Sequence, residues 1–265
     1  MATLVRALLD TELSELNQSV LILSSMVDEA IGHAIDALLT NDDALAGSVI
    51  AGDAEINRLR FQIEEKAYVI LSTQQPLARD LRTVIAAIHF AIELERIGDH
   101  AAGIARIVQR MQEMPQPVVF EATASEEPAA EIGEAAGAPL SDAAASDALV
   151  PGDKAAPVRL KLSRLPKMTK RARDMLHRAT EAYIERDVEK ANAIVKRDRK
   201  IDNQYRKFFG EAMAEIASKH VAEMPTYLLW IAHNLERIGD RTTNLAERVV
   251  FMVTGQYTEV LEDYE

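Results

Sequence analysis

Apolar residues recur every three or four positions along most of the chain, and this spacing places them on one face of an α-helix. Proline favours the first turn of a helix, so Pro76 and Pro225 are expected at two of the helix starts. The pattern predicts six helices, over residues 4–40, 43–71, 75–113, 164–186, 188–219 and 225–253. Three long helices in each half favour an all-α fold of two tandem three-helix bundles.

Residues 121–157 interrupt this pattern, because they are rich in Ala, Glu, Pro, Gly and Ser and offer little to bury. Their eight acidic residues and single lysine carry most of the formal net charge of −12. Such a composition is typical of a mobile linker or a surface insertion. We therefore expect a first bundle over residues 1–120, an acidic linker over 121–157 and a second bundle over 158–265.

The motif LERIGD occurs at residues 94–99 and again at 235–240, in the third predicted helix of each half. The residues that follow also match, since LERIGDHAAGIAR parallels LERIGDRTTNLAER. A repeat of this kind usually reflects the duplication of one structural unit. The two bundles are therefore expected to share one architecture.

Acidic residues flank the apolar stripes of the second and third predicted helices in each half. Flanking positions of the same sense on neighbouring antiparallel helices face one groove, so each half is expected to gather these side chains. Clustered carboxylates repel one another unless a cation lies among them, and oxygen ligands suit hard or borderline ions. The predicted metal ligands are Asp53, Asn57, Glu95 and Asp99 in the first half, and Asp198, Asp202, Glu236 and Asp240 in the second.

The pattern does not identify the metal, for which Fe, Mn, Mg, Zn and Ca are candidates. A glycine inside a helix costs about 1 kcal/mol relative to alanine. Gly98 and Gly239, which lie inside the repeated motif, are expected to let another helix or a ligand approach the backbone closely. His89 and His233 lie one or two turns before the acids and are either additional ligands or ordinary residues at the border of the core.

A solvated face with ion pairs is the alternative interpretation of any single pair of these acids. The arginines near enough in sequence to neutralise them are Arg58, Arg60, Arg96 and Arg106. Four acid or amide pairs at matched places, two in each half, favour the metal interpretation over this alternative.

Composition excludes several classes of function. The net charge of −12 argues against nucleic acid as the main partner, because phosphate binding needs a basic surface. The absence of cysteine excludes disulfides and thiolate chemistry. Acids occur too early for a signal peptide, and no apolar run approaches the ~20 residues that span a bilayer, so a cytoplasmic protein is expected.

Enzymatic function has little support in the sequence. A ferritin-like di-iron enzyme needs Glu-x-x-His on two helices, and no histidine of this chain has a glutamate three positions before it. No Ser-His-Asp order, phosphate-cradling glycine loop or G-x-G-x-x-G is present. Trp230, Phe208 and Phe209 are expected in the core. A metal-free helical scaffold or adaptor remains the alternative function.

The paired motifs resemble those of the PhoU family of phosphate-uptake regulators. The resemblance rests on the two LERIGD motifs, NLAERVVFMVTG after the second one, VIAGDAEIN in the second helix and QQPLARDLR opening the third. It covers nearly the whole chain apart from residues 121–157.

The resemblance implies two three-helix bundles related by a pseudo-twofold axis, metal clusters at the acid-x-x-x-Asp motifs, and a homodimer. It implies a regulator without catalytic activity that restrains phosphate uptake and phosphate-starvation signalling when phosphate is plentiful. The partners it implies are the ATPase of a phosphate ABC importer and a sensor histidine kinase. Asn57 stands where a second carboxylate is expected, which puts the metal site of the first half in doubt.

Overall fold

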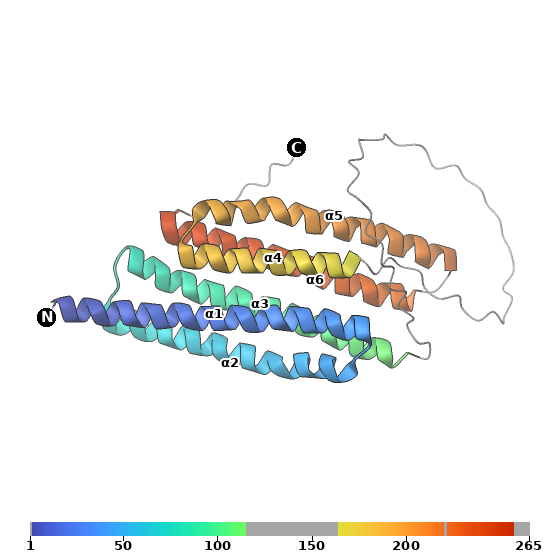
Figure 1. Cartoon of the computed structure of the whole chain (residues 1–265), viewed down its shortest axis with the longest axis horizontal. Coiled ribbons are helices and arrows are strands. Elements are labelled where there is room, and N and C mark those ends of the chain that lie inside the picture. The colour runs from blue at the N-terminus through green and yellow to red at the C-terminus, as the bar shows by residue number, and fades with distance from the viewer. Residues whose placement is uncertain (1, 115–163, 220–221, 257–265) are drawn as a thin grey trace.

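The computed structural model describes residues 2–114, 164–219 and 222–256, and within them the chain forms six helices and no strand. The helices are α1 (Ala2–Thr40), α2 (Asp43–Gln74), α3 (Arg79–Gln112), α4 (Arg164–Glu185), α5 (Val188–Lys219) and α6 (Glu223–Thr254) (Figure 1). The prediction of an all-α protein is confirmed. The predicted linker, residues 121–157, lies outside the described residues, so its boundaries stay a prediction.

The two halves form two bundles packed side by side (Figure 1). Helices α1, α2 and α3 contact one another in the first bundle, while α6 contacts both α4 and α5 in the second, where α4 also contacts α5. Between the bundles, α3 packs on α6 and α1 packs on α4. Each of these contacts joins a helix to its counterpart in the repeat, as a pseudo-twofold relation between the halves requires.

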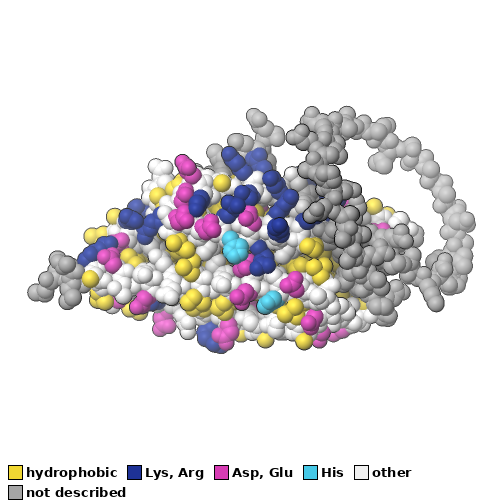
Figure 2. All heavy atoms as spheres, in the orientation of Figure 1, with side chains coloured by type: hydrophobic (Ala, Val, Ile, Leu, Met, Phe, Trp, Pro, Cys, Tyr) yellow, Lys and Arg dark blue, Asp and Glu magenta, His cyan; other side chains and the backbone are white. Residues whose placement is uncertain are grey.

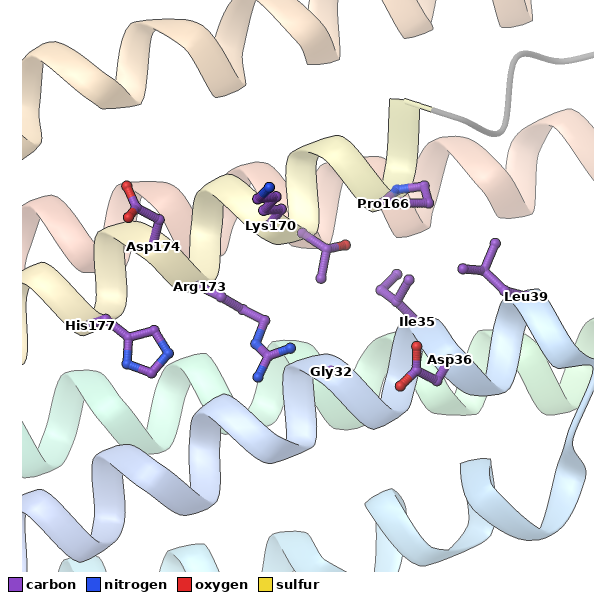
Figure 3. A pocket seen from close by; sticks show the side chains of 10 residues that line it. Gly32, Ile35, Asp36, Leu39, Pro166, Lys170, Arg173, Asp174 and His177 are labelled. Carbon is purple, nitrogen blue, oxygen red and sulfur yellow. The ribbon is translucent and has the colours of Figure 1, made fainter. Parts of the chain in front are cut away.

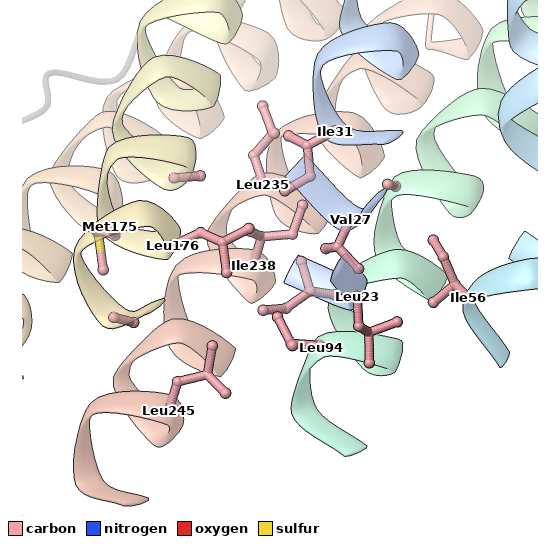
Figure 4. Close-up of a cluster of buried hydrophobic side chains, with 14 of the residues drawn as sticks. Leu23, Val27, Ile31, Ile56, Leu94, Met175, Leu176, Leu235, Ile238 and Leu245 are labelled. Carbon is pink, nitrogen blue, oxygen red and sulfur yellow. The ribbon is translucent and has the colours of Figure 1, made fainter. Parts of the chain in front are cut away.

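One continuous core fills both bundles and the contact between them (Figure 4). Leu23 and Val27 of α1 lie there with Leu94 of α3, Leu176 of α4 and Leu235 of α6, and all five are fully buried. Burying a side chain of this size stabilises the fold by about 1.5–3 kcal/mol. The apolar stripes predicted for the third helix of each half are confirmed. All their members are buried: Leu94, Ile97, Ala101, Ile104 and Val108 in α3, and Leu235, Ile238, Thr242, Leu245 and Val249 in α6.

The turn after the first helix of each half has the same geometry in both bundles. Asn41 and Arg186 adopt the left-handed conformation, with φ of 55° and 57°. The next residue caps the following helix: Asp42 Oδ1 accepts from the Leu45 N–H, and Asp187 Oδ1 accepts from the Lys190 N–H, both at 2.9 Å. The duplication therefore extends to the turns.

Two sequence expectations are wrong. Helix α3 begins at Arg79, after Ala78 with a φ of 47°, so Pro76 precedes the helix rather than lying in its first turn. Trp230 and Phe209 are 49% and 46% exposed, whereas Phe208 is fully buried as expected. Each residue advances about 100° around a helix, so Phe209 points well away from the buried stripe that contains Phe208.

Polar contacts also join the two bundles. Arg173 of α4 donates two hydrogen bonds to the Asp28 carboxylate of α1, at 2.8 and 2.7 Å. Ser24 and Thr180 share a hydrogen bond of 2.7 Å across the same contact.

Charged side chains of both signs lie on the face shown in Figure 2, where Lys and Arg gather over α4 and α5. No helix in the described part of the chain has the length and apolar character needed to cross a membrane.

Candidate metal centre

Three aspartates converge between the second and third helices of the C-terminal half. Asp198 and Asp202 lie one turn apart on α5, and Asp240 faces them from α6. Each offers a carboxylate oxygen, and the three oxygens lie within 4.8 Å of one another. All three side chains are partly buried, so the groove holds them close together with restricted access to water. A single cation could contact all three.

Gly239 explains how the two helices come so close at this point. A methyl group built on its α-carbon would lie 2.6 Å from Asp198 Oδ1 and 3.2 Å from Ile201 Cδ1. Any residue with a side chain would therefore push Asp198 away from α6. The expectation that this glycine permits a close approach is confirmed, and its neighbour is the candidate ligand itself.

Glu236 completes the anionic groove one turn before Asp240. Burial, together with the charges of Asp240 and Asp202, raises the pKa of Glu236 from its ordinary 4.5 to about 7. Its Oε2 is buried and accepts no hydrogen bond, although His233 Nδ1 lies 3.3 Å away. His233 is half exposed, and its contact with Glu236 lacks hydrogen-bond geometry, so this buried oxygen has no hydrogen-bond donor among the described residues. The groove thus favours a positive charge near Glu236.

An arginine of α6 also touches this groove. Arg237 Nη1 lies 2.8 Å from Asp240 Oδ2, an ion pair within α6 that sequence reasoning missed. Tyr205 of α5 is only partly buried and also belongs to the groove, since burial and the charge of Glu236 raise the pKa of its phenol. The i, i+3 spacing from Arg237 to Asp240 was the available sequence signal for the ion pair.

The N-terminal half assembles a looser version of the same arrangement. Burial and the charge of Asp99 raise the pKa of Asp53, and burial with the charges of Asp99 and Asp53 raises that of Glu95. These three acids therefore do face one groove between α2 and α3. Asp99 is exposed, however, and the C-terminal trio is the one group of three such ligands found this close among the described residues.

Three substitutions at repeat-related positions distinguish the two grooves. Asn57 replaces the carboxylate of Asp202, and its amide donates to the Asp53 backbone carbonyl at 3.1 Å. Arg106 occupies the position of Glu247 in the second copy of the motif, and Arg60 occupies that of Tyr205. The first groove therefore has fewer anionic groups and more cationic ones.

The sequence suggested that four nearby arginines could neutralise the acids of the first groove, and the structure supports this only in part. Arg106 Nη2 lies 3.6 Å from Asp53 Oδ2, which is a direct ion pair with a predicted ligand. The Arg60 charge lowers the pKa of Glu95 against the effect of burial. At ion-pair distance, however, Arg58, Arg60 and Arg96 contact other acids, namely Glu55, Glu64 and Glu93.

Gly98 also permits close packing, but against an apolar side chain. A methyl group added there would lie 3.1 Å from Ile56 Cγ2. Of the two histidines considered as additional ligands, His233 borders the C-terminal groove through Glu236. The pKa of His89 is lowered by burial and by Arg248, with Glu93 opposing them, which places its charged neighbours outside the groove acids.

A cavity of about 410 Å³ lies between α1 and α4, away from both grooves (Figure 3). Its lining combines apolar side chains with Lys170, Arg173, Asp36 and Asp174. Arg173 is already engaged by Asp28, and the remaining charges are of both signs. This cavity therefore shows no preference for a charged ligand.

Comparison with known proteins finds a family whose members share this sequence pattern. A family model described as the PhoU domain matches two stretches of the chain, residues 20–108 and 165–249. Each stretch contains one acidic groove and one LERIGD motif. The resemblance inferred from the motifs is thereby confirmed.

Relatives match over almost the entire chain. The phosphate-specific transport system accessory protein PhoU homolog of Clostridium acetobutylicum is 28% identical over 262 residues, covering 97% of this chain and 99% of that protein. The PhoU homolog of Rhizobium meliloti is 30% identical over 248 residues, covering 93% and 87%.

Two solved structures share the fold. The phosphate transport system regulatory protein PhoU from Streptococcus pneumoniae has a TM-score of 0.73 at 27% identity, covering 95% of this chain and all of that one. PhoU from Pseudomonas aeruginosa has a TM-score of 0.73 at 24% identity, covering 93% and 99%, and supports the fold alone.

Proposed function

This chain belongs to the PhoU family, and we propose that it is the accessory regulator of a phosphate transport system. In this role it restrains phosphate uptake and phosphate-starvation signalling when phosphate is plentiful. The observation that carries the proposal is the near full-length similarity to a phosphate-specific transport system accessory protein. The proposed action is through contact in the cytoplasm, without catalysis.

Gene deletion tests the regulatory role. Deletion is expected to derepress phosphate-starvation genes, or to raise phosphate uptake, in cells grown at high phosphate. Restoring the gene should reverse the change. If neither gene expression nor uptake differs between the deletion strain and its parent, the regulatory proposal is wrong.

The proposed partners are the ATPase of a phosphate ABC importer and a membrane-bound sensor histidine kinase. Their support is family membership. A pull-down with tagged protein from phosphate-replete cells should recover one or both of these proteins. If repeated preparations recover neither, the proposal of these partners is wrong. The proposed homodimer is tested separately by light scattering on the purified protein.

We further propose that the C-terminal groove holds a metal ion through Asp198, Asp202 and Asp240, with Glu236 beside them. The residues fit an oxygen-preferring cation, because three carboxylate oxygens lie within 4.8 Å of one another and a buried Glu236 oxygen accepts no hydrogen bond. When bound, the ion supplies positive charge that neutralises the groove and ties α5 to α6. Its role is structural or regulatory.

The N-terminal groove fits a metal less well. Asp53, Glu95 and Asp99 remain candidate ligands, with Asn57 as an amide ligand. Arg106 already lies 3.6 Å from Asp53 and supplies positive charge from within the protein. We therefore propose that this groove binds metal more weakly than the C-terminal one.

Metal analysis decides between a metal-binding regulator and a metal-free scaffold. Protein purified without added ions, then titrated with Mg²⁺, Mn²⁺, Fe²⁺ and Zn²⁺, is expected to retain or bind ions that the variant Asp202→Asn loses. A scaffold that works through its surface alone would bind none and would regulate normally when Glu95 and Glu236 are both replaced by alanine.

A further inference from the structure

A cavity of about 360 Å³ is lined by residues from the starts of α1 and α3 and from the turn between α4 and α5. These three segments lie at the same end of the molecule (Figure 1). The cavity is distinct from both acidic grooves and from the cavity of Figure 3. Three arginines line it, with two aspartates beside them: Arg6, Arg79, Arg186, Asp10 and Asp80. The protein as a whole carries a net charge of −12, so a group of arginines here departs from the general balance.

Arg6 forms an ion pair with each of the two aspartates. Its Nη1 lies 2.6 Å from Asp80 Oδ2, and its Nη2 lies 2.8 Å from Asp10 Oδ1. Among the residues that the structure describes, neither Arg79 nor Arg186 forms an ion pair with a carboxylate. Both guanidinium groups line the cavity, where they act on one another, and the charge of Asp80 offsets that of Arg186 only beyond ion-pair distance.

Arg186 occupies a backbone position that does not suit it. It has a φ of 57°, and the equivalent residue of the other half, Asn41, has a φ of 55°. Both turns are closed in the same way, since Asp42 N–H donates to the Ala37 carbonyl and Asp187 N–H to the Ala182 carbonyl, each at 3.0 Å. Asparagine tolerates this region, whereas most other side chains are strained in it.

The contacts of the Arg186 side chain explain why an arginine stands at this unfavourable backbone position. From the turn it reaches α3, where its Nη2 donates to Thr83 Oγ1 at 3.1 Å. That contact fixes the guanidinium beside the first turn of α3, which begins at Arg79. Burial and the nearby charge of Arg79 both lower the pKa of Arg186, as expected for two like charges held close together.

We propose that Arg79 and Arg186 bind the phosphate group of a small molecule, either inorganic phosphate or a phosphate monoester. Guanidinium groups match the oxygens of phosphate in pairs, and a dianion relieves the repulsion between two of them. The positive end of the α3 dipole adds to the attraction. This site uses neither acidic groove and needs no metal, so it goes beyond the proposed function and stands or falls separately.

Two neutral side chains complete the site. Ser14 lines the cavity with a hydroxyl, and Asn17 with an amide. The Tyr183 hydroxyl donates to Asn17 Oδ1 at 2.7 Å, which fixes the amide and leaves its nitrogen as a donor. Tyr183 is itself held against Phe90, with ring centroids 4.3 Å apart. Hydrogen-bond donors are thus present on α1 as well as at the two arginines.

Calorimetric titration of the full chain at constant ionic strength tests the proposal, with inorganic phosphate in one arm and glycerol 3-phosphate in the other. Saturable binding at one site per chain is expected in at least one arm. Tighter binding in the first arm assigns free phosphate as the ligand, and tighter binding in the second assigns an ester. The variants Arg186→Asn and Arg79→Gln should each weaken binding by about tenfold or more, since a charge-assisted hydrogen bond contributes about 1.5–3 kcal/mol.

The control is Arg58→Gln, which removes the same charge from an exposed position on α2 and should leave binding unchanged. Arg186→Asn places at this turn the residue type that the equivalent turn already has, so its unfolding temperature should equal or exceed that of the wild type. No saturable binding in either arm overturns the proposal. Equal affinities for the wild type and both cavity variants overturn it as well.

Discussion

Asp198 of α5 lies directly against the backbone of Gly239 of α6, so that a methyl group at Gly239 would lie 2.6 Å from Asp198 Oδ1. The equivalent glycine of the other half, Gly98, has Ile56 as its nearest neighbour, at 3.1 Å. Both glycines therefore admit an isoleucine of the preceding helix, since Ile201 lies 3.2 Å from the same point at Gly239, and only Gly239 also admits a carboxylate.

Gly239→Ala is expected to displace Asp198 from the aspartate trio and to weaken metal binding by about tenfold or more. Stability should change little, because the gain of about 1 kcal/mol in helix propensity offsets part of the steric cost. Metal titration and urea unfolding measure the two effects. Gly98→Ala is the matched control, since Ile56 must shift there by only a few tenths of an ångström. Metal binding weakened equally by both variants would refute the idea that Gly239 positions a ligand.

Exchange of the distinguishing residues should alter the two grooves in opposite directions. Asp202→Asn gives the C-terminal groove the amide of its counterpart and should lower metal content. The double variant Asn57→Asp with Arg106→Glu gives the N-terminal groove two added acids and removes the cation of Arg106, so metal bound per chain should rise. Elemental analysis after dialysis against each metal measures both. An unchanged metal content in the double variant would show that Arg106 and Asn57 do not limit that groove.

The ion pair between Arg173 and Asp28 should stabilise the contact between the bundles. Arg173→Gln is expected to lower the free energy of unfolding by about 1–2 kcal/mol, because the pair is bidentate but Arg173 is 39% exposed. The exposed pair formed by Arg178 and Asp174 within α4 provides the control, and Arg178→Gln should cost less than about 0.5 kcal/mol.

The same pair predicts a pH dependence. Burial tends to raise the pKa of Asp28, yet Arg173 and, to a lesser extent, His177 together outweigh it and lower that pKa below the ordinary 3.8. A lowered pKa in the folded state means stability that is present above pH 3.8 and is lost as the pH falls through the folded value. The difference between wild type and Arg173→Gln should therefore shrink in urea titrations below pH 3.8. A constant difference across this range would contradict the assignment.

Glu236 predicts the opposite slope in metal-free protein. Its pKa rises from 4.5 to about 7 on folding, so the folded state holds the proton more tightly than the unfolded chain. Its contribution to stability is thus present below pH 4.5 and is lost as the pH rises through about 7. Thermal unfolding in the presence of a chelator should show this loss in the wild type and a smaller one in Glu236→Gln. Glu55→Gln, at an exposed position of α2, should behave as the wild type does.

Local sequence was sufficient for the helices and for the side of each helix that carries the acids. Periodicity predicted the ends of α1, α4, α5 and α6 to within a few residues. The apolar stripe that a helix buries follows from the spacing of the apolar residues in its own sequence. The prediction was wrong at the start of α3. Pro76 indicated a helix start there, but Ala78 has a positive φ, so the helix begins only at Arg79. The repeat of LERIGD predicted the duplicated fold, since duplicated sequence packs in duplicated ways.

How closely the acids approach one another depended on tertiary structure. Asp198, Asp202 and Asp240 form a tight trio, while Asp53, Glu95 and Asp99 share a looser groove. Every candidate ligand has a counterpart in the other half, and only the pair of Asp202 with Asn57 differs in charge. The distance between two helices is set by the side chains that meet between them, and the direction of a long arginine depends on every charge within its reach. The sequence by itself therefore determined which faces meet, and packing in three dimensions decided which charges touch.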